Sequence, residues 1–162
     1  MAEKEKTLVE LKKNYEQYTK RYKLPSFHEL NRDFEAERVY ERETDFLLRE
    51  IRKVMMDKVL GYLRFVELLL NPTNAPLFFF GLVKGMGMDD KKTLEKIYAK
   101  LGEFEIDVIE LDNDYTDEKE AQFILNVFKE WQQVKSDLKG VVGSLRSGWN
   151  QKTIPKEKGY MG

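Results

Sequence analysis

The sequence predicts an all-α protein folded as a helical bundle, with about four main helices and two short ones. Apolar residues recur at spacings of three and four along most of the chain, which is the period of an amphipathic helix. No segment shows the sustained alternation of a half-buried strand, and only four prolines interrupt the 162 residues. A chain of this length can bury a real core within one domain.

Two helices are predicted before residue 35. A seam of large side chains at spacings of three and four marks the first over 7–22, and it consists of Leu8, Leu11, Tyr15, Tyr18 and Tyr22. Pro25 ends this helix, because the residue before a proline is pushed out of the α region. Ser26 with Glu29 then forms a capping box, which predicts a short second helix whose apolar stripe extends to Phe34.

One helix is predicted to be unusually long, at about 34–70. This stretch contains no proline and only one glycine, Gly61. A continuous helix of this length would measure about 55 Å, whereas a compact domain of this size has a radius of gyration of about 15 Å. We therefore expect the helix to bend or break near 42–44, or to project from the body of the protein.

The most apolar part of the chain runs from Val59 to Val83. It reads VLGYLRFVELLL, then NPTNAP, then LFFFGLV, and the prolines of the middle segment stop the long helix. The last run predicts a short helix over 75–84. Both runs fall short of the ~20 apolar residues that a bilayer span requires. Arg64 and Glu67 also interrupt the first run, so no membrane span is expected.

Two further helices follow. An apolar face over 94–109 predicts the first of them, and a capping box of Asp117 with Glu120 opens the last. The apolar period decays after Lys139, beyond which glycines recur. We therefore expect one helical domain over 1–139 and an irregular or mobile basic C-terminal tail over 140–162.

The composition excludes several kinds of chemistry. The absence of cysteine rules out a disulfide, a thiolate zinc site and a cysteine nucleophile. The formal net charge of -1 gives no overall attraction to nucleic acid or to acidic membranes. The charged start of the chain, MAEKEKTLVELKK, lacks the apolar region of a signal peptide, so we expect a cytoplasmic protein.

Signals for catalysis or metal binding are weak. The sequence has one histidine, His28, and it does not belong to a Glu-x-x-His pair of the kind that binds iron in helical bundles. The stretch 103–120 holds nine acidic residues and one lysine. Oxygen ligands for a hard cation are available there from Asp112, Asp114 and Asp117, although the glycine and final glutamate of an EF-hand loop are missing. Other interpretations of this stretch are a solvated helix face and a docking surface for a basic partner.

The apolar block supplies the leading functional hypothesis. Phe78, Phe79 and Phe80 lie about 100° apart on one helix, so they cannot all face one core. Arg64 and Glu67 belong to a narrow polar stripe that faces either water or a partner. We expect a non-enzymatic protein–protein interaction module that self-associates or is a subunit of a complex. The candidate interface residues are Tyr62, Arg64, Phe65, Glu67, Leu77, Phe78, Phe79 and Phe80.

A nucleic-acid-associated helical protein is the alternative hypothesis. The segment 135–162 carries six basic and two acidic residues with aromatic residues among them, a composition that can track single-stranded nucleic acid. The candidate contacts are Lys139, Arg146, Trp149, Lys152, Lys156 and Lys158. A metal-binding helical-bundle enzyme ranks third. We predict no catalytic residue, no cofactor and no small-molecule substrate.

Two stretches of the chain, both within residues 24–52, resemble a known group. The segments LPSFHELNRDFE over 24–35 and FLLREIR over 46–52 are similar to uncharacterised all-helical proteins of archaea. That group has no assigned activity, so the resemblance implies no function. It favours a conserved helical core and a prokaryotic cytoplasm.

Overall fold

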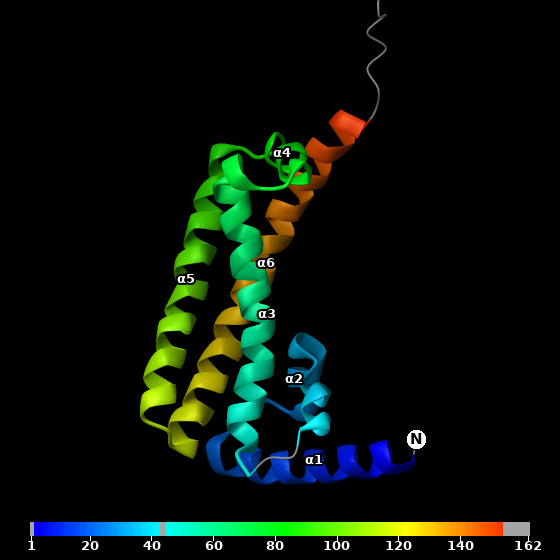
Figure 1. Cartoon of the computed structure of the whole chain (residues 1–162), viewed down its shortest axis with the longest axis vertical. Coiled ribbons are helices and arrows are strands. Elements are labelled where there is room, and N and C mark those ends of the chain that lie inside the picture. The colour runs from blue at the N-terminus through cyan, green and yellow to red at the C-terminus, as the bar shows by residue number, and fades with distance from the viewer. Residues whose placement is uncertain (1, 43–44, 154–162) are drawn as a thin grey trace, which may run out of the picture. The chain divides into compact units, whose positions relative to one another are not determined.

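The protein is all-α, as predicted, in a computed structural model that describes residues 2–42 and 45–153 (Figure 1). The described residues form six α-helices and two short 3-10 helices, without any strand. In chain order they are α1 (Ala2–Tyr22), α2 (Phe27–Phe34), η1 (Ala36–Glu41), α3 (Leu47–Leu70), η2 (Pro72–Asn74), α4 (Leu77–Val83), α5 (Met88–Asn113) and α6 (Asp117–Thr153). Four long helices and two short α-helices match the prediction.

The predicted long helix over 34–70 is broken earlier and more widely than expected. Helix α2 ends at Phe34 because Glu35 adopts a left-handed conformation with φ 55° and donates its backbone N–H to Asn31. The next turn is 3-10, and α3 begins only at Leu47. Ala36 and Val39, three residues apart, are both buried, which suits the three-residue period of a 3-10 helix.

The longest helix is instead α6, which has 37 residues and continues to Thr153. The expectation of an irregular tail from residue 140 is therefore wrong up to residue 153. Val141 and Leu145 are almost fully buried, and burying such side chains contributes about 1.5–3 kcal/mol each. That gain offsets the cost of the glycines in this segment, about 1 kcal/mol each. Residues 154–162 lie outside the described residues.

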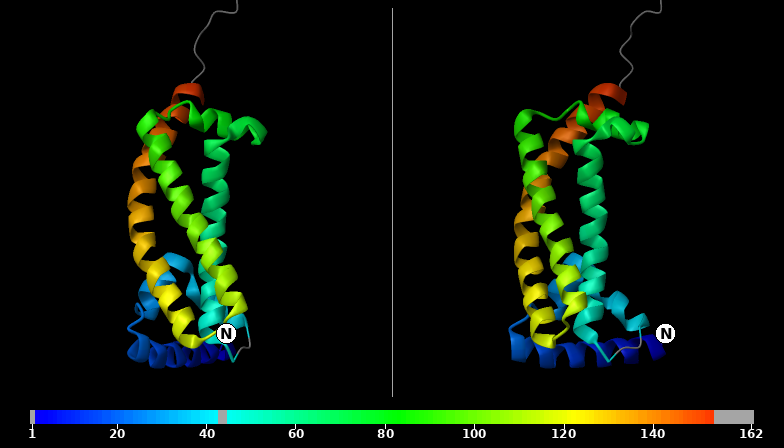
Figure 2. Two further views of the ribbon diagram at one scale, coloured as in Figure 1. Left: turned by 90° about the vertical axis from the view of Figure 1, so that its left-hand side faces the viewer. Right: turned by 60° about the vertical axis from the view of Figure 1, so that its left-hand side comes forward.

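The chain divides into two compact units, and α3, α5 and α6 each contribute to both. Unit 1 consists of Met1–Tyr62 and Leu101–Gln132. In this unit α1 lies crosswise to α3 and α6 (Figures 1 and 2). Trp131, which is 1 % exposed, lies in the core of this unit, and its ring centroid is 5.5 Å from that of Phe34.

Unit 2 consists of Leu63–Lys100 and Gln133–Gly162, and α4 lies within it. Its core is formed by apolar side chains of α3, α5 and α6, namely Val66, Leu69, Leu94, Ile97, Val134 and Val141. Among the described residues, none of the helices combines the length and the apolar character needed to cross a membrane.

Candidate interaction surface

Helix α4 presents large apolar side chains to solvent. Pro76 occupies its N-cap position, and the backbone N–H of Phe79 donates to the Pro76 carbonyl at 2.9 Å. Leu77 is 85 % exposed, Phe78 50 % and Phe80 41 %. Phe79 instead turns inward, with its ring 5.8 Å from that of Phe65 on α3. The prediction that the phenylalanine triplet cannot face a single core is confirmed.

Trp149 of α6 lies against this short helix. Its ring centroid is 5.2 Å from that of Phe78. A Cβ atom added to Gly81 would lie only 2.9 Å from the Trp149 ring, so the glycine makes room for the indole. The rings of Phe79, Phe78 and Trp149 therefore pack against one another in succession in unit 2.

Two glycines allow the segment after α4 to approach α6 this closely. A Cβ atom at Gly85, just after α4, would lie 2.6 Å from the Cα atom of Gly148 on α6. A Cβ atom at Gly148 would lie 2.5 Å from the Cα atom of Gly85. Neither separation is sterically possible, so both positions require glycine.

An apolar groove of about 340 Å³ lies between these elements in unit 2. Its lining residues are Phe65, Phe78, Leu82, Val142, Leu145, Arg146 and Trp149. We define the α4–α6 surface as this groove together with the exposed Leu77. Among the groove residues, Arg146 is the single charged side chain. The surface therefore has the composition of a protein contact site, with aromatic residues and an arginine around an apolar centre.

The structure brings together only part of the predicted interface. Phe65, Leu77, Phe78 and Phe79 lie in the same region of unit 2, around α4. Tyr62 belongs to unit 1, where its ring packs 5.3 Å from that of Trp131.

The polar stripe on α3 faces solvent, so Arg64 and Glu67 take no part in the groove. Its members are all exposed, and they are Lys53, Asp57, Gly61, Arg64, Glu67 and Asn71. A Cβ atom at Gly61 would find no atom within 4 Å, so no close approach requires that glycine.

Val142 was missed by sequence reasoning. It is 46 % exposed and lines the groove. The signal was present, because Leu138, Val142, Leu145 and Trp149 keep helical spacings of four, three and four. Gly140 and Gly143 within that stretch made the period appear to decay.

Four of the six residues predicted to contact nucleic acid lie on α6. Lys139 and Arg146 are exposed on it, and Trp149 is 37 % exposed with part of its ring covered by α4. Lys152 lies in the last turn of α6, and its side chain is not among those described. Lys156 and Lys158 lie outside the described residues.

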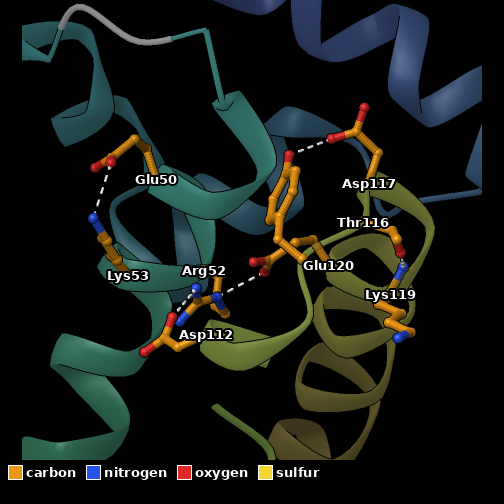
Figure 3. Close-up of polar contacts among 9 residues, drawn as sticks. Glu50, Arg52, Lys53, Asp112, Thr116, Asp117, Lys119 and Glu120 are labelled. Atoms are coloured by element: carbon orange, nitrogen blue, oxygen red, sulfur yellow. Dashed lines mark hydrogen bonds and ion pairs between the residues drawn. The ribbon is translucent and has the colours of Figure 1, made fainter. Parts of the chain in front are cut away.

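A separate, polar site in unit 1 is the ion-pair cluster around Arg52 (Figure 3). Arg52 is 2 % exposed and donates from Nε to Glu120 at 2.7 Å and from Nη2 to Asp112 at 2.8 Å. Burial by itself lowers the pKa of Arg52, but the hydrogen bonds and charges of Glu120 and Asp112 outweigh it and raise the pKa. Arg52 therefore stays charged and joins α3 to α5 and α6 within this unit.

Glu120 was predicted to cap α6, and the structure shows a different role. Its side chain is fully buried against Arg52. The cap is Thr116, whose hydroxyl accepts the backbone N–H of Lys119 at 3.1 Å. The Ser26–Glu29 capping box of α2, in contrast, is confirmed, because Glu29 accepts from the Ser26 backbone and the Ser26 hydroxyl accepts from the Glu29 backbone.

Arg49 and Tyr115 extend this polar cluster. The guanidinium of Arg49 lies 4.3 Å from the ring centroid of Tyr115 and 5.2 Å from that of Phe46. The Tyr115 hydroxyl donates to Asp117. Burial first and that hydrogen bond second raise the pKa of Tyr115, which keeps the phenol protonated.

The three aspartates considered as cation ligands point to different partners. Asp112 accepts from Arg52, Asp114 from Lys119, and Asp117 from Tyr115. Across the described part of the chain, no three histidine, aspartate or glutamate side chains are grouped as a metal site would require. His28 is exposed on α2.

The chain matches no protein-family model, no curated protein and no solved structure.

Proposed function

We propose that the protein is a non-enzymatic interaction module that binds protein through the α4–α6 surface, either as a self-associating chain or as a subunit of a complex. The observation that carries the proposal is the exposure of Leu77 and Phe78 beside an apolar groove. Exposed apolar patches with a polar rim are typical of protein contact sites. Tryptophan and arginine, present here as Trp149 and Arg146, are enriched among residues that dominate binding energy.

The packing of the aromatic residues supports a preformed contact surface. Phe78 lies against Trp149 and Phe79, and Gly81 leaves room for the indole ring. Side chains already held in place lose little rotational freedom when a partner covers them. The same packing covers part of the Trp149 ring, so less of the ring is free to stack on a nucleic-acid base, and protein contact is favoured.

A pair of matched valine substitutions tests the proposal. Val142→Glu places a charge in the groove, whereas Val9→Glu makes the same change on the outer face of α1, where the valine is 64 % exposed. The full chain, wild type or variant, would be affinity-purified from its own cells and measured by size-exclusion chromatography with light scattering. We expect a complex for the wild type and Val9→Glu, and a bare single chain for Val142→Glu.

If all three proteins elute as single chains without a companion, or if Val142→Glu keeps the whole complex, the α4–α6 surface is not the contact site. Circular dichroism of each variant checks that the helices are intact.

A further inference from the structure

A second exposed apolar spot lies on α5, in unit 1. Ile106 is 60 % exposed and Ile109 is 59 % exposed. Residues three apart lie on the same side of a helix, so the two isoleucines project together. A partner that covers both side chains would remove their apolar area from water.

Acidic side chains flank this isoleucine pair on both sides. Glu105 lies four residues before Ile109, and Glu110 lies four residues after Ile106. Both glutamates are exposed. We define the α5 face as Glu105, Ile106, Ile109 and Glu110. It is an apolar ridge with negative charge along its edges.

The side of α6 that borders the α4–α6 surface carries the opposite charge, from Arg146 within the groove and Lys139 beside it. On α6, Lys139, Val142, Arg146 and Trp149 follow one another at spacings of three, four and three, so they share one side of the helix. Val142, Arg146 and Trp149 also line the apolar groove. This side of α6 is therefore hollow, apolar and positive, whereas the α5 face is projecting, apolar and negative.

We propose that the α4–α6 surface of one copy of the chain binds the α5 face of a second copy. Ile106 and Ile109 enter the groove, and Glu105 and Glu110 lie opposite the basic residues of α6. The inference rests on the proposed function and adds the identity of the partner. Each copy offers both surfaces, so reciprocal pairing closes a two-fold dimer, whereas successive head-to-tail pairing builds rings or open chains.

Charge sets the specificity of this pairing. Two α5 faces repel each other, as do two basic sides of α6, so the self-pairings of either surface are disfavoured. The apolar groove supplies area removed from water, and the opposite charges orient the approach. The net charge of -1 shows that this complementarity comes from the distribution of charges rather than their sum.

A charge-swap experiment tests the proposal. The first variant reverses the α5 face with Glu105→Lys and Glu110→Lys, and the second reverses α6 with Lys139→Glu and Arg146→Glu. The third carries all four changes. Sedimentation velocity over a concentration series would measure self-association of each purified full chain. We expect each double variant to associate at least about tenfold more weakly than the wild type, and the fourfold variant to regain association.

The outcomes separate this inference from the proposed function. If the fourfold variant associates no better than the double variants, or if the wild type is a single chain at every concentration, the pairing with a second copy is wrong. If only the α6 reversal weakens self-association, the α4–α6 surface is a contact site that meets another part of the second copy, and the inference fails alone. If neither reversal nor Val142→Glu changes any complex, the proposed function fails with it.

Discussion

At the scale of single residues, the atoms around a glycine decide whether a larger residue could replace it. Gly148 and Gly143 lie five residues apart on α6. A Cβ atom at Gly148 would collide with the backbone of Gly85, whereas a Cβ atom at Gly143 would find nothing within 4 Å. The first glycine permits two segments to touch, and the second only weakens the helix.

Substitution by alanine should therefore have opposite effects at these two positions. We predict that Gly148→Ala destabilises the protein by about 1–3 kcal/mol through overpacking. Gly143→Ala should stabilise it by up to about 1 kcal/mol, because alanine is the better helix former. Urea unfolding followed by circular dichroism measures both. Equal effects of the two substitutions would show that Gly85 and Gly148 do not touch.

The buried ion pair leads to a second residue-scale prediction. Arg52→Met leaves Glu120 charged, fully buried and unpaired, which should cost about 3–5 kcal/mol of unfolding free energy. Adding Glu120→Leu should recover most of that loss, because no unpaired charge then remains in the core. Asp112→Asn is the control and should cost about 0–1 kcal/mol, since Asp112 is 60 % exposed. Urea unfolding of the four proteins would reject the account if the double variant were the least stable.

At the scale of elements, the start of α3 depends on ion pairs. Glu50, in its first turn, accepts from Arg42 at 2.7 Å and from Lys53 at 3.2 Å. Burial by itself raises the pKa of Glu50, but these hydrogen bonds and charges outweigh it and lower the pKa. A carboxylate with a lowered pKa in the folded state stabilises the protein above its unfolded-state pKa, and this contribution disappears as the pH falls through the folded-state value.

Stability should follow that pH dependence. We predict that Glu50→Gln is less stable than the wild type near neutral pH. The difference should shrink as the pH falls below about 4 and the wild-type carboxyl becomes protonated. Chemical denaturation at a series of pH values measures the difference. A gap that stays constant from neutral to acid pH would mean that these ion pairs do not hold the start of α3.

Much of the element order could be predicted from the sequence. The helical period and the Ser26–Glu29 capping box are local signals, and the structure confirms the all-α class and that cap. The interruption was expected near 42–44 but begins already at Glu35, because the left-handed Glu35 and the burial of Val39 depend on tertiary packing.

The rest of the site depends on contacts between segments distant in the sequence. The continuation of α6 past residue 140 depends on Val141 being buried and on Gly148 meeting Gly85. The pairing of Arg52 with Glu120 joins residues 68 positions apart. No local pattern carries that information. The sequence did indicate that the phenylalanines of α4 could not all be buried, which is the part of the site that it predicts well.

At the scale of the whole molecule, two oppositely charged surfaces make association sensitive to salt. The Debye length falls from about 10 Å at 0.1 M ionic strength to about 3 Å at 1 M. We predict that self-association weakens between these salt concentrations and that the apolar groove keeps a residual part of it. Sedimentation velocity at both concentrations measures the change. Association that strengthens with salt would indicate an apolar contact without charge pairing.

The central claim is that another copy of the chain covers the α4–α6 surface, and acrylamide quenching of tryptophan fluorescence tests it most directly. The protein has two tryptophans: Trp131 is 1 % exposed and Trp149, on that surface, is 37 % exposed. The quenchable signal therefore reports Trp149. We predict that quenching decreases as the wild-type concentration rises and stays constant for Val142→Glu. Quenching that is independent of wild-type concentration, under conditions where the chain self-associates, would contradict the claim.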